Sequence, residues 1–153
     1  MRPPIAMVVL VLAGLALPGC ERDPQDSPEG ALAQWVAAMN ASRSDISARR
    51  RAYELLSDPA RASLGERAAR ASQLSGRDIQ PWEMLAPGRF TLHIPFDPEA
   101  LVATTTGDHA IIVARGRAGD RAEVPMVREA GHWRVDLTLP PMRAVQTDRD
   151  GGV

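Results

Sequence analysis

The sequence predicts an α+β domain, with helices in its first half and an antiparallel sheet in its second half. From residue 28 to about residue 74, apolar side chains recur at the three- to four-residue spacing of a helix face. From residue 90 to residue 139 the apolar period falls to two, and glycine-containing turns separate the short runs. Helices followed by a curved antiparallel meander form an α+β layout.

The first helix is predicted to begin at Ser27-Pro28-Glu29. Serine is a favoured N-cap, proline fits the first turn, and an acidic side chain is stabilised at the positive end of the helix dipole. The apolar stripe of this helix comprises Ala31, Leu32, Trp35, Val36 and Met39.

Two more helices are predicted, over residues 46–56 and from Asp58-Pro59 to about residue 74, with Gly76 as the C-terminal cap of the second. Residues 81–85 are predicted to form one further turn. The inward side chains of the two helices are Ala52, Tyr53, Leu56, Leu64, Ala68 and Ala71.

Five strands are predicted, and the second and third are joined by Gly107-Asp108, a tight hairpin signal. Pro125 lacks an N–H, so its strand should be an edge strand or carry a bulge there. Trp133 and Val135 face one side of the last strand, while Arg134 and Asp136 face the other. The strands cover residues 90–94, 101–106, 109–115, 121–128 and 132–139.

The start of the chain has the parts of a secretory signal peptide. Arg2 is followed by an apolar stretch over residues 5–17, which is shorter than the roughly 20 residues of a membrane span. Leu17-Pro18-Gly19-Cys20 resembles the bacterial lipobox, although Pro18 departs from the usual second residue. The resemblance implies cleavage between Gly19 and Cys20, a diacylglycerol group on the Cys20 thiol and an acyl chain such as palmitate on its amino group.

Lipidation also accounts for a single cysteine in an exported chain. We therefore expect a signal peptide over residues 1–19, a lipidated flexible tether over 20–27, one domain over 28–139 and a disordered tail over 140–153. Glu21 is not the aspartate that resembles an inner-membrane retention signal. The expected location is the cell envelope, on the outer membrane facing the periplasm.

The closing pattern Glu129-x-Gly131-x-Trp133-Arg134-Val135-Asp136-Leu137 resembles the nuclear-transport-factor-2-like superfamily. The resemblance covers residues 27–139 and implies a cone-shaped domain with a cavity between helices and sheet. Ketosteroid isomerase, polyketide cyclases and many bacterial lipoproteins share this fold. Because the fold carries enzymes and non-enzymes alike, it does not decide function.

Few residues suggest chemistry. Lys and Arg total 18 against 19 Asp and Glu, so no basic face indicates nucleic acid. His93, His109 and His132 fall on separate strands without metal-site spacing, and no metal, cofactor or catalytic residue is predicted. Arg49-Arg50-Arg51 is most simply a solvated helix face. In the second strand, His109 and Arg115 are expected in phase with Ile111 and Val113, at the rims of the cone.

Two functions remain open. The first is a non-catalytic envelope lipoprotein, attached to membrane lipid through Cys20, that contacts another envelope protein or holds an apolar ligand. The alternative is a small cofactor-free enzyme of the isomerase or cyclase kind, acting in the cone. The side chains expected to line that cavity are Trp35, Tyr53, Trp82, His109, Arg115 and Trp133.

Overall fold

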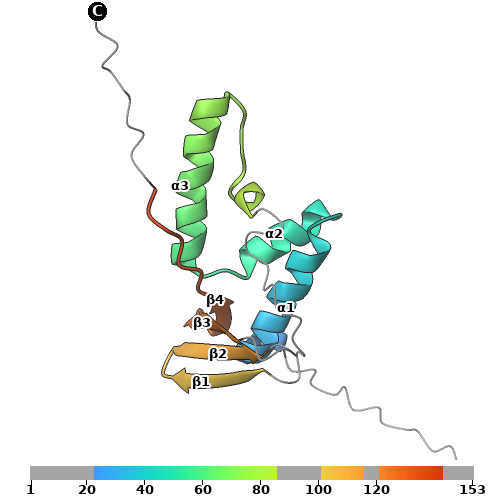
Figure 1. Ribbon diagram of the computed structural model, residues 1–153, viewed down its shortest axis with the longest axis vertical. Coiled ribbons are helices and arrows are strands. Elements are labelled where there is room, and N and C mark those ends of the chain that lie inside the picture. Colours follow the sequence, from blue (N-terminus) through green and yellow to red (C-terminus); the bar gives the residue numbers. More distant parts are fainter. Residues whose placement is uncertain (1–22, 86–100, 116–120, 143–153) are drawn as a thin grey trace, which may run out of the picture.

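The computed structural model describes residues 23–85, 101–115 and 121–142. Within these ranges the protein is α+β, with three α-helices, two 3-10 helices and one antiparallel sheet of order β1-β2-β3-β4 (Figure 1). The predicted strand over residues 90–94, the signal peptide with Gly19 and Cys20, and residues 143–153 lie outside the described residues. The elements are η1 (Pro24–Asp26), α1 (Pro28–Ala41), α2 (Ile46–Glu54), α3 (Asp58–Ser75), η2 (Pro81–Met84), β1 (Val102–Thr106), β2 (His109–Arg115), β3 (Arg121–Glu129) and β4 (His132–Val135).

The helix boundaries follow from capping chemistry. The Ser27 hydroxyl accepts a hydrogen bond from the Gly30 N–H at 3.1 Å, and the Asp45 carboxylate accepts one from the Ser47 N–H at 2.8 Å. Gly76 closes α3 with a φ of 68°, as a C-terminal glycine should. The predicted end of α2 at Leu56 is wrong, because Leu56 instead forms a parallel bridge with Val135.

The residues before α1 are ordered where the sequence predicts a flexible tether. Pro24–Asp26 forms η1, and the Asp23 carboxylate caps it by accepting a hydrogen bond from the Gln25 N–H at 2.9 Å. Gly30 permits this packing, because a Cβ there would collide with the Pro24 carbonyl oxygen. The tether prediction over 20–27 is therefore wrong from Asp23 onward. Capping and close backbone packing replace the apolar side chains that the segment lacks.

The strands form a meander in sequence order, with two-residue turns between β1 and β2 and between β3 and β4. Gly107 takes a φ of 59° between β1 and β2, while Ala130 and Gly131 both take positive φ between β3 and β4. β4 ends at Val135, four residues before the predicted end, although Leu137 and Leu139 still pack against the core.

Pro125 lies inside a central strand, at the point where one of its two neighbours ends. Ile111 pairs with Pro125 in an unbroken register, so β3 has no bulge there. On the other side Pro125 accepts a hydrogen bond from the Asp136 N–H at 2.9 Å but has no N–H to donate in return. Pairing with β4 stops at the neighbouring Met126. From Pro125 back to its first residue, β3 is therefore paired with β2 but has no β4 partner on its other side.

One face of the sheet packs against the helices and forms the core with α1. The buried side chains of the sheet are Ala110, Ile112, Ala114, Val124, Met126, Trp133 and Val135, and those of α1 include Leu32, Trp35 and Met39. The prediction that Ile111 and Val113 face inward is wrong, since Ile111 is 42% exposed while Ile112 is fully buried. Alternation predicts two faces but does not say which one the helices cover.

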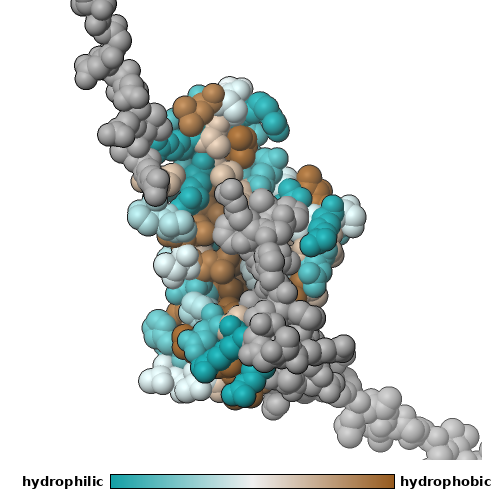
Figure 2. Space-filling view, viewed as in Figure 1, coloured by the Kyte–Doolittle hydropathy of each residue, from teal (hydrophilic) through white to brown (hydrophobic). Residues whose placement is uncertain are grey.

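The residues after β4 run along α3. Figure 1 shows this segment beside the lower half of α3, where the Arg67 guanidinium donates a hydrogen bond to the Pro140 carbonyl. Ala60, Leu64 and Ala68 form the buried side of α3. In Figure 2, hydrophobic side chains show in the seam beside α3, with hydrophilic ones along its outer edge.

Candidate functional site

The connection between α2 and α3 adds a short strand-like segment to the free edge of β4. The Ser57 N–H donates to the Val135 carbonyl, and the Val135 N–H donates to the Leu55 carbonyl, both at 3.0 Å. β4 is thereby paired on both sides, with β3 on one and residues 55–57 on the other. The junction fixes α2, α3 and β4 relative to one another.

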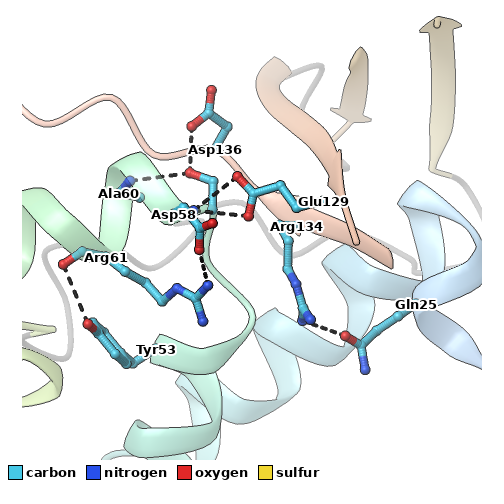
Figure 3. A network of polar contacts seen from close by, with 9 residues as sticks. Gln25, Tyr53, Asp58, Ala60, Arg61, Glu129, Arg134 and Asp136 are labelled. Atoms are coloured by element: carbon cyan, nitrogen blue, oxygen red, sulfur yellow. Dashed lines mark hydrogen bonds and ion pairs between the residues drawn. The ribbon is translucent and has the colours of Figure 1, made fainter. Parts of the chain in front are cut away.

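Polar side chains reinforce this junction. The Ser57 hydroxyl donates a 2.7 Å hydrogen bond to Asp136 and accepts one from the Ala60 N–H at 3.3 Å. The Glu129 carboxylate accepts from the Asp58 N–H, with both oxygens at 3.0 Å. A carboxylate at the start of α3 is favourable because the helix dipole is positive there. Figure 3 shows these contacts around the first turn of α3.

A groove of about 660 Å³ lies next to the junction, between α1, α2, the start of α3, β4 and η1. One wall is made of small apolar side chains, and three arginines from three different elements contribute to the rest. The lining residues are Gln25, Gln34, Ala37, Ala38, Ala41, Arg51, Glu54, Leu55, Arg61 and Arg134. Three guanidinium groups against the single carboxylate of Glu54 give the lining a positive charge.

Two of the arginines already contact carboxylates at the groove's margin. Arg51 lies 3.5 Å from Asp45 and also donates to the Ser47 hydroxyl. Arg61 pairs with Asp58, one turn earlier on α3. Both carboxylates face solvent, with side chains 46% and 73% exposed, so neither pair is closed off from water.

Arg134 is held differently. Its Nη1 donates a 2.5 Å hydrogen bond to the neutral amide oxygen of Gln25, and the side chain is half-buried. Within the described ranges, no carboxylate lies within ion-pair distance of it. In Figure 3 the Arg61 guanidinium lies against Asp58, whereas that of Arg134 lies against Gln25. Among the described residues, the groove therefore presents a partly desolvated cation without a counter-ion.

Asp45 is the N-cap of α2 and pairs with Arg51, one of the groove arginines. The Ser47 hydroxyl donates to its carboxylate at 2.7 Å, and the Ser47 N–H donates at 2.8 Å. These hydrogen bonds, with a smaller contribution from nearby Arg51, hold the pKa of Asp45 below its ordinary value.

The side chains predicted to line a common cavity separate into three groups. Trp35 and Trp133 are 2% and 5% exposed and belong to the core, against which half-buried Tyr53 packs. The Tyr53 hydroxyl donates to the Arg61 carbonyl at 3.5 Å. Trp82 lies on η2, where the Arg50 guanidinium sits 5.5 Å from the ring centroid.

His109 and Arg115 are not at the rim of an interior cavity. Both lie on the exposed face of β2, opposite the face that carries Ala110, Ile112 and Ala114. The prediction fails because Ala110, Ile112 and Ala114, and not Ile111 and Val113, lie on the face of β2 that packs in the core. Small side chains on β2 allow the helix to pack closely, and the branched residues on the other face give no burial signal by themselves.

The three arginines of the groove could not be predicted by searching the sequence for residue types that are typical of catalytic sites. Arg51 belongs to the Arg49-Arg50-Arg51 run, of which the described structure takes only Arg51 into the groove. Arg61 could have been noticed as the first-turn residue after Asp58-Pro59, and Arg134 as the charged residue of the closing strand. Nothing in their spacing along the chain indicates that the three converge.

No cluster of three metal-ligating His, Cys, Asp or Glu side chains occurs in residues 23–85, 101–115 and 121–142. Among these same residues, no helix combines the length and the apolar character needed to cross a membrane. Comparison with known proteins found no matching family model, no similar curated protein and no similar solved structure.

Proposed function

We propose that this protein is a lipid-anchored envelope protein whose domain is non-catalytic and binds its ligand or partner in the arginine-lined groove. The observation that carries the binding role is the convergence of Arg51, Arg61 and Arg134 beside an alanine wall. In the described residues, Ser42 and Ser57 are the buried residues of polar type, and both hydroxyls are hydrogen-bonded, while the buried indole N–H of Trp35 has no partner among these residues. An interior of this kind favours packing over proton transfer.

The cone-shaped fold of the nuclear-transport-factor-2-like superfamily is part of the same proposal. Three helices precede an antiparallel meander, and Trp133 and Val135 of the closing motif pack inward. In the proposed arrangement the ligand site lies in the groove beside α1, outside the packed core formed by Trp35 and Trp133. The sequence alone suggests an apolar ligand within the cone. We propose instead a ligand that contacts both the arginines and the alanines of the groove.

The anchor is proposed from the lipobox resemblance at Leu17-Pro18-Gly19-Cys20. An acylated amino group and a diacylglyceryl thiol together exceed the two lipid signals that stable attachment requires. The test is expression of the full chain and of Cys20→Ser in cells labelled with palmitate. The full chain should be labelled and shortened, whereas Cys20→Ser should accumulate as unlabelled precursor.

A Cys20→Ser protein that matures to the same size and still takes up label would contradict the anchor. Density-gradient separation of the two membranes tests the proposed outer-membrane location. The non-catalytic part is tested separately with steroid-like and polyketide-like ketones. An isomerisation rate that disappears in Tyr53→Phe or His109→Ala would refute the non-catalytic proposal and support the alternative, a small isomerase or cyclase.

A further inference from the structure

We propose that the groove binds an anionic phospholipid, whose headgroup phosphate contacts Arg51, Arg61 and Arg134 and whose apolar part lies along α1. The inference rests on the proposed function, because it takes the groove as the binding site and Cys20 as the lipid attachment. It goes further by naming the class of ligand. Three features of the groove support it: a half-buried cation, an apolar wall and a short distance to the membrane.

The cation is Arg134, which has no ion-pair partner in the part of the chain that the structure describes. A half-buried guanidinium has lost part of its hydration, and the amide of Gln25 does not neutralise its charge. A partly buried charge without an opposite charge beside it is costly, so a bound anion at this position would be stabilising. Phosphate suits the site because a guanidinium presents parallel N–H donors that match two phosphate oxygens.

Arg51 and Arg61 can join in this contact without losing their present partners. Each guanidinium has five N–H donors, and the carboxylates of Asp45 and Asp58 occupy only some of them. The side chain of Arg61 is 32% exposed, so it is already partly held against the protein surface. Little side-chain entropy would then be lost when it contacts a ligand.

The apolar wall is formed by Ala37, Ala38 and Ala41 of α1 together with Leu55. Ala37 and Ala41 are one helical turn apart and both are exposed, so they present a smooth surface without polar groups. A free phosphate would leave this wall in water. The volume of about 660 Å³ lies within the roughly 300–1,000 Å³ of small-molecule sites, which admits a headgroup with part of its acyl region.

The membrane is within reach of the groove. Gln25 lines the groove and follows Cys20 by five residues, which span at most about 18 Å when fully extended. A lipid on Cys20 would therefore keep the groove close to a surface of phospholipid headgroups. Such tethering raises the effective concentration of the ligand, so a modest intrinsic affinity is sufficient.

The test uses the mature lipidated chain purified in a non-ionic detergent. Dihexanoyl phosphatidate, dihexanoyl phosphatidylcholine and inorganic phosphate are titrated separately, with native mass spectrometry as the readout. Phosphatidate should bind at least about tenfold more tightly than either of the others. Equal binding of inorganic phosphate would mean that the alanine wall contributes nothing, and equal binding of phosphatidylcholine would mean that charge is not recognised. Either result, or no binding, overturns the proposal.

Variants then locate the site. Arg134→Gln should weaken phosphatidate binding about tenfold, the usual effect of losing a hydrogen bond to a charged group. Arg115→Gln is the matched control, because this exposed arginine of β2 lies outside the groove lining. Ala37→Glu places a negative charge in the groove at an exposed helix position, so it tests the site even if Arg134→Gln folds poorly. Unchanged affinity in Ala37→Glu would refute the placement. The measured mass reports the acyl chains on Cys20, so failure of lipidation is distinguished from failure of binding.

Discussion

Ser57 and Asp136 are separated by 79 residues in the chain and joined by a 2.7 Å hydrogen bond that the serine hydroxyl donates. The same hydroxyl accepts a hydrogen bond from the Ala60 N–H, so a single buried side chain both caps α3 and fixes the residue after β4. The Ser57 hydroxyl oxygen thus makes both the local capping bond of α3 and a long-range tertiary contact.

Replacing Ser57 by alanine should remove both functions together. We expect the free energy of unfolding to fall by about 2–5 kcal/mol, the sum of a lost N-cap and a lost hydrogen bond to a carboxylate. Urea unfolding followed by circular dichroism would measure it. Ser44→Ala is the control, because Ser44 is exposed and its hydroxyl makes only a 3.5 Å contact. Equal unfolding midpoints for the two variants would show that the Ser57 contact contributes no stability.

Trp133→Ala should be among the most destabilising single changes in the domain. Trp133 is 5% exposed on the core face of β4, and truncation of a buried aromatic residue costs about 3–5 kcal/mol. Trp82→Ala should cost clearly less, since Trp82 is half-buried on η2 beneath an arginine. Thermal unfolding of the two variants compares them directly, and similar shifts would contradict the assignment of Trp133 to the core.

Ala130 is a site for stabilisation. Its φ of 49° lies in the left-handed region, which an L-residue with a Cβ occupies at a cost of about 1 kcal/mol. Ala130→Gly should therefore raise the free energy of unfolding by about 0.5–1 kcal/mol, while Gly131→Ala, with φ at 87°, should lower it. Differential scanning calorimetry measures whether each variant is more or less stable than the parent protein. A destabilised Ala130→Gly would argue against the proposed turn geometry.

Asp45 links stability to pH. Its pKa is below the ordinary value of 3.8 in the folded protein, so its charged form stabilises the fold at pH values above that ordinary pKa. This contribution should be lost as the pH falls through the lowered folded-state pKa. Asp45→Asn keeps a capping oxygen but removes the charge, so it should be less stable than the parent at neutral pH and equal to it in strong acid. Acid titration of unfolding for both proteins is the measurement.

Carboxyl NMR provides a control for the cause of that pKa shift. Ser47 supplies the two largest contributions, through its hydroxyl and its N–H. In Ser47→Ala the hydroxyl bond disappears, and the pKa of Asp45 should move up toward its ordinary value. An unchanged titration midpoint would mean that the hydroxyl does not act on Asp45.

The sequence predicts the helices and turns well because their signals are local. Ser27 and Gly76 mark helix ends through bonds to residues within four positions, and the turns at 107–108 and 130–131 follow from their glycines. The end of α2 is different. Leu56 continues the helical pattern but pairs with Val135 in the structure, a partner that no local pattern identifies.

The candidate site was beyond sequence analysis for a related reason. Arg51, Arg61 and Arg134 have no shared spacing, and they converge only because residues 55–57 pair with β4. The burial of β2 was predicted for the wrong face, since Ile112 and its flanking alanines carry less apolar bulk than Ile111 and Val113 together. Which face is covered depends on where α1 packs, and this is a property of the whole fold.

The double pairing of β4 also bears on when the domain can fold. During synthesis, the Leu55 carbonyl and the Ser57 N–H have no strand to pair with until Val135 has been made. Contacts of such long sequence separation form late, because the chain must first close a large loop. We therefore expect chains that stop before residue 132 to expose an unpaired edge of β3 and the part of the core that Trp133 and Val135 cover, as aggregation-prone intermediates do. Completion of the chain, more than formation of the early helices, should then set the moment at which the protein becomes resistant to proteases.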